Sequence, residues 1–137
     1  MPSFNIFDIA GSGMSAQTVR LNTTASNLAN ADSVSSTDAA AYKARHPVFK
    51  AVQSALHQSK TGSSVKVMGI VQSKDKAPAR YEPGNPMANS DGYVYASNVN
   101  VVEEMADMIS ASRSYQNNVE VMNTSKDLML ATLKVGQ

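Results

Sequence analysis

The stretch from Gly11 to Ala16 has the spacing of a glycine-rich turn that binds dinucleotides. It matches G-x-G-x-x-[GA], follows an apolar stretch and precedes a helical pattern. In that motif the glycines let a pyrophosphate approach a helix N-terminus, and an acid about 20 residues further on binds the ribose. Asp32 lies near that distance, but a second strand should follow the helix, and residues 32–41 are polar and small like a loop. We therefore favour close helix packing or a bend as the role of the two glycines.

No other group of residues predicts catalysis. His46 and His57 are the only histidines, and the chain has no cysteine, so no metal-ligand spacing, disulfide or thiol chemistry is available. Glu103 and Glu104 are adjacent on a predicted helix and would point in different directions, which favours helix capping over paired acid–base work. We expect no catalytic residue, no metal site and no cofactor.

Residues 42–80 are strongly basic, although the whole chain has a net charge of only +1. This segment could contact nucleic acid, another acidic polymer or an acidic neighbouring subunit. Its aromatic residues are too sparse for a base-stacking platform. A solvated basic face is the preferred interpretation, with an acidic neighbour second, and we expect no nucleic-acid partner.

The N-terminal segment, residues 4–31, has helical spacing but an unusual composition. Arg20 is the only charged residue between Asp8 and Asp32, and the side opposite the apolar stripe is rich in Asn, Thr and Ser rather than Lys and Glu. A water-facing surface would be charged, so this helix is predicted to face other helices. Its heptad-like stripe consists of Phe7, Ala10, Met14, Gln17, Leu21, Thr24, Leu28 and Ala31.

The C-terminal segment, residues 100–135, predicts a longer helix. Asn100 followed by Glu103 forms a capping-box pattern, and Lys134 suits the negative end of the helix dipole. Such a helix spans about 50 Å, which is too long for the core of a compact chain of this size. Its apolar stripe is wider than one helix–helix seam, so the remaining faces need partners from other chains.

Between the helices, residues 65–71 and 93–96 predict strands, and Pro and Gly separate them. The fold class is therefore α+β: long N- and C-terminal helices pair as a coiled-coil-like domain (1–31 with 98–137), and residues 32–97 form a small β-rich insert. The sequence has no apolar run long enough to span a membrane. No basic residue precedes Arg20, so we expect no Sec-type signal peptide.

Several stretches are similar to a known family. The segment SGMSAQTVRLNTTASNLANADS resembles the N-terminal signature of the bacterial flagellar axial proteins, the rod, hook and hook-associated family. Within that family, the stretches YKARHPVF, YEPGNPMANSDGYV and NVNVVEEMADMISASRSYQNNVEVMNTSKDLMLATL, together with the short length, most resemble a proximal-rod protein of the basal body. The resemblance covers well over half of the chain.

The resemblance implies a structural, non-enzymatic subunit. Its terminal helices would pack into a tube of many copies around an export channel, in contact with other rod proteins and with the membrane ring and export-gate base. The subunit would reach the periplasmic rod through the flagellar type III export apparatus, and the rod would transmit torque. Weak helix propensity in residues 4–31 suits a segment that becomes ordered only on assembly.

We predict that the assembly interface lies on both terminal helices. On the N-terminal helix it comprises Phe7, Met14, Gln17, Leu21, Asn22, Ser26, Asn27, Leu28 and Asn30. On the C-terminal helix it comprises Val101, Met105, Met108, Ile109, Arg113, Tyr115, Gln116, Val119, Met122, Asn123, Met129 and Leu133. The alternatives are another rod- or hook-type axial subunit and, less favoured, a small polyanion- or dinucleotide-binding module.

Overall fold

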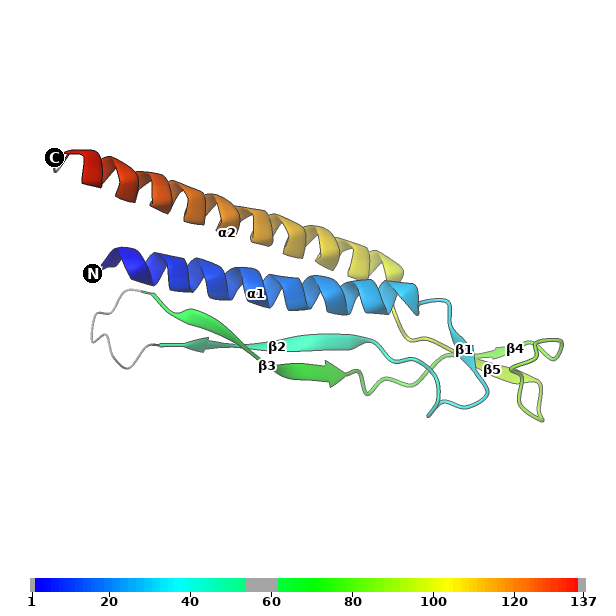
Figure 1. Ribbon diagram of the computed structural model, residues 1–137. Helices are drawn as coiled ribbons and strands as arrows, with labels where there is room; N and C mark the ends of the chain where they lie inside the picture. The colour runs from blue at the N-terminus through cyan, green and yellow to red at the C-terminus, as the bar shows by residue number, and fades with distance from the viewer. Residues whose placement is uncertain (1, 54–61, 136–137) are drawn as a thin grey trace.

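Two long helices dominate the computed structural model, which describes residues 2–53 and 62–135. Helix α1 (Pro2–Ala29) has 28 residues and α2 (Val101–Val135) has 35. They lie side by side and run in opposite directions, so the start of α1 and the end of α2 are at the same end of the molecule (Figure 1). The predicted pairing of two long terminal helices is confirmed.

The residues between the helices form two small antiparallel sheets. The five strands are β1 (Val34–Ser35), β2 (Arg45–Val52), β3 (Ser64–Gln72), β4 (Ala79–Tyr81) and β5 (Tyr93–Ala96). Strands β2 and β3 form a two-stranded ribbon, and β5 lies between β1 and β4 in the other sheet. The α+β class with a small β region between two helices is therefore confirmed.

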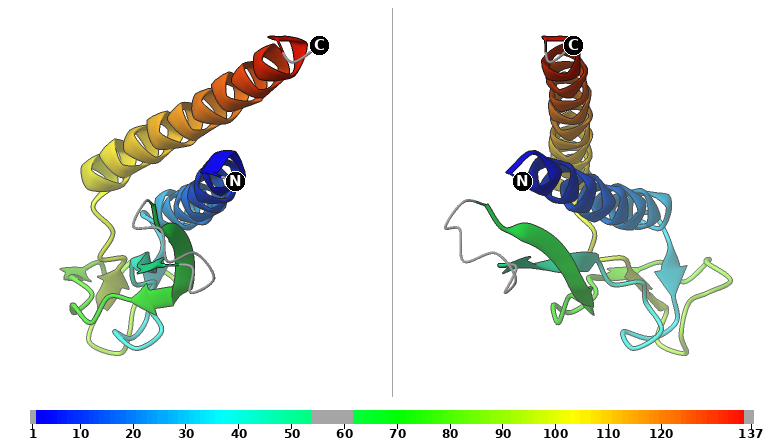
Figure 2. Two further views of the ribbon diagram at one scale, coloured as in Figure 1. Left: turned by 90° about the vertical axis from the view of Figure 1, so that its left-hand side faces the viewer. Right: turned by 60° about the vertical axis from the view of Figure 1, so that its left-hand side comes forward.

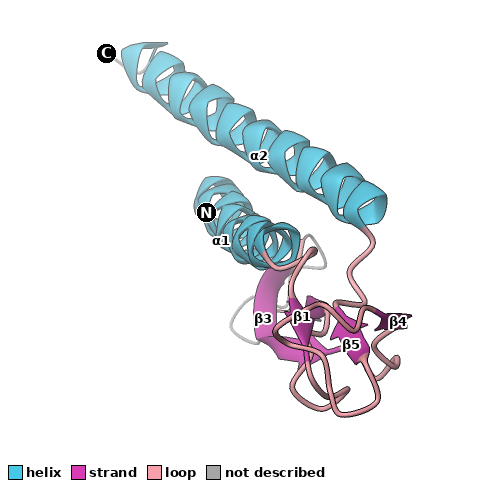
Figure 3. Cartoon of the chain, turned by 90° about the vertical axis from the view of Figure 1, so that its right-hand side faces the viewer, coloured by secondary structure: helices cyan, strands magenta, loops and turns pink. Residues whose placement is uncertain are grey.

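Helix α1 lies between α2 and the β2–β3 ribbon, as the two turned views show (Figure 2). It contacts α2 on one side and both strands of the ribbon on another. Among the described helices and strands, α2 contacts α1 alone. The three-stranded sheet and its loops lie beyond the C-terminal end of α1 (Figure 1), and Figure 3 views the molecule from that end. Helix α2, helix α1 and the β2–β3 ribbon thus form three layers, with α1 in the middle.

Three of the five strands were not predicted from the sequence. Strands β3 and β5 match the predicted strands 65–71 and 93–96, but β1, β2 and β4 were not predicted, and β1 lies in the predicted loop 32–41. Pro47 lies inside β2 and weakens its strand pattern. Because β2 has only one neighbour, a residue without an N–H is tolerated on its free edge. The division into domains 1–31 with 98–137 and 32–97 stays a prediction, since the β2–β3 ribbon packs directly on α1.

The buried interior consists mainly of small side chains. Ala10, Ala16 and Ala111 are almost completely buried, and the largest fully buried side chains are Val94 and Asn27. Small residues let the backbones of α1 and its neighbours approach closely. In contrast, many large apolar side chains are exposed, including Val102 (77%) and Leu133 (68%) on α2. A chain with so small a core leaves most of its apolar surface for contacts outside itself.

The start of α2 is fixed by the predicted cap and by a loop cluster. The Asn100 side chain accepts hydrogen bonds from the backbone N–H groups of Val102 (3.2 Å) and Glu103 (3.5 Å). Just upstream, the Asn98 side chain accepts from the Ala44 N–H (2.7 Å) and donates to the Ser73 Oγ and the Asp75 carbonyl. The cap confirms the interpretation of Asn100, and the Asn98 bonds join α2 to the loops before and after the ribbon.

Candidate assembly interface

The seam between the two helices is polar and small rather than apolar. On α1, Gly13, Arg20 and Asn27 recur every seven residues and face α2. Arg20 forms an ion pair with Asp107, and a Cβ added to Gly13 would lie 2.9 Å from the Asn118 amide nitrogen. Close packing therefore explains Gly13, as expected, whereas nothing lies within 4 Å of a Cβ added to Gly11.

Asn27 joins all three layers of the molecule. Its side chain is completely buried and donates hydrogen bonds to the Glu104 carboxylate on α2 (2.8 Å) and to the Arg45 carbonyl on β2 (2.8 Å). Its amide oxygen accepts from the Arg45 N–H and from the Tyr42 hydroxyl, both at 3.0 Å. One amide thus fills both its donor and its acceptor capacity with partners from separate parts of the chain.

Other hydroxyl groups of α1 contact the ribbon, the loop before it or α1 itself. Ser12 Oγ accepts a hydrogen bond from the Val65 N–H (3.0 Å), and Ser26 Oγ lies 3.2 Å from the Tyr42 hydroxyl. Thr23 is buried and donates to the Val19 carbonyl within the helix. Contacts with the two neighbouring layers therefore account for some of the amide and hydroxyl groups of α1, whereas Ser15, Thr18 and Asn22 are exposed.

The predicted seam was wrong in register. Of the expected α1 stripe, Ala10 and Thr24 are buried, but Phe7, Met14, Leu21 and Leu28 are only half-buried. The buried residues of α2 are Glu104 and Ala111. They lie on the side of the helix next to the predicted apolar stripe and not within it. The physical reason is that the closest helix–helix contact is made by small and hydrogen-bonding side chains, which leaves the larger apolar groups at its border.

The predicted interface residues on α2 are accessible. None of them is buried by the rest of the chain. Met108, Val119, Met122 and Met129 are half-buried, and the exposed members are Val101, Met105, Ile109, Arg113, Tyr115, Gln116, Asn123 and Leu133. This continuous exposure along α2 leaves an apolar surface that no described element covers.

The predicted interface residues on α1 are less accessible. Asn22 is exposed, Asn27 is occupied inside the chain, and the remaining members are half-buried. These half-buried residues are Phe7, Met14, Gln17, Leu21, Ser26, Leu28 and Asn30. The Gln17 side-chain oxygen is buried without a hydrogen-bond partner among the described residues. Asn27 has no free donor or acceptor for another chain, because its bonds are made internally.

Sequence reasoning missed the polar partners of α1. Glu104 was interpreted as a helix-capping acid, yet it is 3% exposed and bonded to Asn27. Asp107 was not singled out either, although it forms the ion pair with Arg20 on the seam. Asn118 was predicted to lie beside the apolar stripe, where it could hydrogen-bond across helices, and its amide lies against Gly13. A signal existed: Glu104, Ala111, Asn118 and Ser125 recur every seven residues and are all small or polar.

The structure removes the dinucleotide-binding interpretation. Residues 2–29 form one uninterrupted helix, so Gly11–Ala16 lies within it and no strand precedes the motif. His46 is exposed on β2, and His57 lies outside the described residues. No group of three or more potential metal ligands comes together in the part of the chain that is described. Within the same residues, neither helix is long and apolar enough to cross a membrane.

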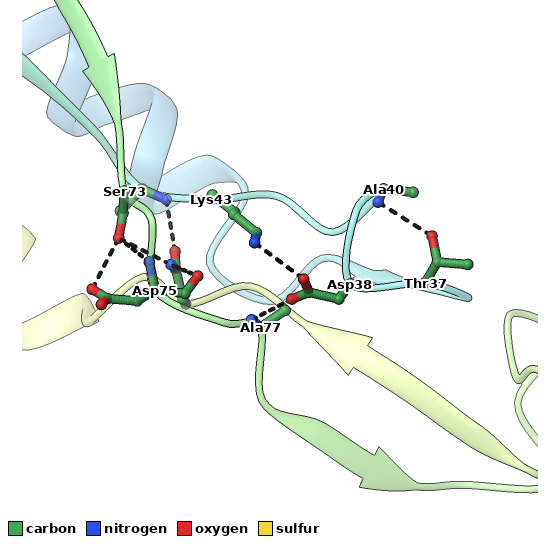
Figure 4. Close-up of polar contacts among 9 residues, drawn as sticks. Thr37, Asp38, Ala40, Lys43, Ser73, Asp75 and Ala77 are labelled. Atoms are coloured by element: carbon green, nitrogen blue, oxygen red, sulfur yellow. Dashed lines mark hydrogen bonds and ion pairs between the residues drawn. The ribbon is translucent and has the colours of Figure 1, made fainter.

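The loops around the ribbon hold a second polar cluster, shown in Figure 4. The Asp38 carboxylate accepts hydrogen bonds from the Ala77 N–H (2.7 Å) and from Lys43 Nζ (3.3 Å). The Ala77 N–H, assisted by the Lys43 and Lys76 charges, lowers the pKa of Asp38 below its ordinary value against a smaller opposing effect of burial. Asp38 thereby ties the loop before β2 to the loop after β3.

Several basic residues of segment 42–80 are already paired. Lys43 contacts Asp38, Arg80 forms an ion pair with Glu82, and the Arg45 guanidinium lies 5.4 Å from the centre of the Tyr42 ring. The exposed lysines of the ribbon, Lys50 and Lys66, have no ion-pair partner among the described residues. Only part of the basic surface is therefore available to a partner.

Comparison with known proteins identifies the family. Models of the flagella basal body rod protein and of the flagellar basal body rod FlgEFG protein C-terminal region match residues 7–35 and 90–135. The chain is 53% identical to the flagellar basal-body rod protein FlgC of Salmonella typhimurium, over the full length of both chains. It belongs to the FlgC family of flagellar basal-body rod proteins. FlgC proteins of Yersinia enterocolitica (52%) and Buchnera aphidicola subsp. Baizongia pistaciae (34%) also match over their full lengths.

Membership of the FlgC family defines the role of the chain in outline. It is a structural subunit of the flagellar basal-body rod, a component of the motility apparatus. Both family-model matches fall on the ends of the chain and include most of α1 and of α2. The segments that make the exposed helical surface are thus the segments that carry the rod-protein signatures.

Proposed function

We propose that this chain polymerises through its two terminal helices into the tubular wall of the proximal rod. Many copies, together with other rod proteins and the membrane-ring and export-gate base, would enclose the export channel and transmit torque. The chain would act without catalysis, and the flagellar type III export apparatus would deliver it to the periplasmic part of the basal body without a cleaved signal peptide.

The observation that carries this proposal is the isolation of α2. It has 35 residues, contacts only α1 among the described elements and exposes large apolar side chains along its length. Burial of such side chains is favourable by roughly 1.5–3 kcal/mol each, so a surface of this extent favours association. Neighbouring subunits of a tube would cover it.

Substitution of one exposed residue tests the helical interface. Ile109 is 55% exposed on α2, so Ile109→Asp should leave folding of the single chain unchanged but place a charge in the assembled interface. We expect the variant to be absent from purified basal bodies and the cells to be non-motile. Leu28→Asp and Met122→Asp should also stop assembly, and because both residues are half-buried in the single chain, their effect on folding is measured alongside.

Met87→Asp is the matched control, because Met87 is 47% exposed in a loop outside the terminal helices. It should assemble and support swimming. Normal motility with Ile109→Asp, Leu28→Asp or Met122→Asp would contradict assembly through the terminal helices. Equal thermal stability of the soluble variants separates lost assembly from lost folding.

A further inference from the structure

The β2–β3 ribbon places two lysines side by side. Lys50 and Lys66 are direct cross-strand partners, and both are exposed. Like charges at such positions destabilise a strand pair, since the Cα atoms lie only about 5 Å apart. An anionic group against this pair would remove the repulsion.

The same ribbon surface is also apolar around the two charges. Val48 and Val52 lie two residues before and after Lys50 and therefore share its face of β2. They are 41% and 37% exposed, and Met68, at the register shift of β3, is 58% exposed. A partner for this surface should combine carboxylates with apolar side chains.

Helix α2 presents that combination on its outer side. Glu120 and Asp127 are exposed and lie two positions beyond the seam residues Asn118 and Ser125. Two residues turn a helix through about 200°, so both carboxylates point away from α1. Among the described residues neither has an ion-pair partner, and Leu130 beside them is 47% exposed.

The distance between the two lysines is compatible with the distance between the two carboxylates. Carboxylates seven residues apart on a helix are separated by about 10 Å along its axis. Two adjacent lysines with long flexible stems spread apart through their own repulsion and can each reach one carboxylate. Partial desolvation by Val48, Val52, Met68 and Leu130 would strengthen such pairs beyond those of open solvent.

One chain cannot make this contact with itself. Helix α1 separates the ribbon from α2, and α2 has no contact with β2 or β3 in the described part of the chain. A contact between two different surfaces on opposite sides of the molecule is heterologous and can continue from copy to copy. Such a contact suits a polymer rather than a closed dimer.

We propose that the ribbon face carrying Lys50 and Lys66 docks on the Glu120–Asp127 face of α2 in a second copy of this chain. The inference rests on the proposed polymerisation and names one of its lateral contacts. In this arrangement Lys50 and Lys66, the lysines of the basic segment 42–80 that the proposal concerns, contact an acidic surface of a neighbouring subunit.

Charge reversal on each side tests the pairing. Lys50→Glu with Lys66→Glu, and separately Glu120→Lys with Asp127→Lys, should each lower the amount of this chain in basal bodies by about tenfold, because attraction becomes repulsion. Each double variant keeps two like charges at the same sites, so folding should not change. The variant with all four substitutions should recover assembly and swimming, and Lys74→Glu, at an exposed lysine outside the ribbon, is the control that should have no effect.

Cysteine cross-linking tests the contact directly, since the natural chain has no cysteine. Lys66→Cys and Asp127→Cys are expressed in different tagged copies of the full chain in the same cells, and assembled rods are oxidised. The expected product is a dimer that contains both tags, whereas Lys76→Cys with Asp127→Cys should give none.

The pairing would be overturned by no recovery in the fourfold variant, by cross-links between two ribbon cysteines, or by cross-links to a different protein alone. If Ile109→Asp abolishes assembly while both double charge variants assemble normally, polymerisation through the helices stands and this contact is wrong. If Ile109→Asp also assembles normally, the proposed function itself fails.

Discussion

At the scale of single residues, Asn27 shows how much structure one amide can organise. Its partners lie on α2, on β2 and in the loop before β2. Without it, the buried Glu104 carboxylate would lose this donor, and the Arg45 carbonyl and N–H would each lose one partner. Replacing this residue should therefore cost more than the loss of one ordinary hydrogen bond.

Asn27→Ala should lower the free energy of unfolding by about 3 kcal/mol, because Glu104 stays buried after its donor is removed. Urea unfolding of the soluble chain measures the change. Asn30→Ala is the control, since its side chain donates only to the Ser26 carbonyl and is half-buried, and it should cost much less. Adding Glu104→Gln to Asn27→Ala should recover part of the loss, and an equal loss in Asn27→Ala and Asn30→Ala would contradict this role.

The Asp38 carboxylate links the loop before β2 to the loop after β3, and this link depends on pH. Its pKa is lowered in the folded chain chiefly by the Ala77 N–H, so the folded state favours the ionised form. This contribution to stability is complete above the unfolded value of about 3.9 and is lost as the pH falls through the lower folded pKa. Unfolding midpoints between pH 2 and pH 6, followed by tyrosine fluorescence, should fall less steeply with acid for Asp38→Asn than for the natural chain. Identical profiles would show that Asp38 makes no such contribution.

At the scale of elements, α1 owes its position to its small and polar residues. An ordinary amphipathic helix has one buried side, whereas α1 has α2 and the ribbon on two sides. Gly13 allows the close approach to Asn118, and Gly11, two residues away, meets no neighbour. The same substitution at Gly11 and at Gly13 can therefore be compared without and with a close neighbour, within one helix.

Gly11→Ala should stabilise α1 by up to about 1 kcal/mol, since alanine favours the helix and its methyl group meets open space. Gly13→Ala should gain clearly less, because the new Cβ displaces the Asn118 amide from its bond to the Ser114 carbonyl. Thermal unfolding followed by circular dichroism measures both variants. Adding Asn118→Ala to Gly13→Ala should restore the missing gain, and equal gains for the two single variants would contradict close packing at Gly13.

At the scale of the whole molecule, α2 is supported by one neighbour only, so it should open more readily than the sheets. In the free chain at low concentration, trypsin should cut at Arg113 and Lys126 on α2 before it cuts within β3 at Lys66. Mass analysis of the fragments identifies the order. Early protection of the sites on α2, or of Arg20 on α1, would mean that the free chain is already a rigid globule and that ordering is not coupled to assembly.

The sequence by itself determined the helices and the class of the fold. Heptad spacing, the Asn100 cap and the length of residues 100–135 were enough to predict both helices to within a few residues, because these signals are local. The rod- and hook-type motifs at both ends of the sequence also pointed to the family that the comparisons then established.

Only the tertiary structure decided which side of each helix is buried within the chain. Hydrophobic periodicity predicted that the sides of the helices with Leu21 and Met105 would be buried. The contacts between α1 and α2 are instead made by the pairs Arg20–Asp107 and Asn27–Glu104. Paired polar groups can pack there because small neighbouring residues bring the two helices close together. Such pairing depends on residues 77 or more positions apart, and no local pattern reports it. Strand β2 was missed for a similar reason: its conformation comes from pairing with β3, which the residues around Pro47 do not encode alone.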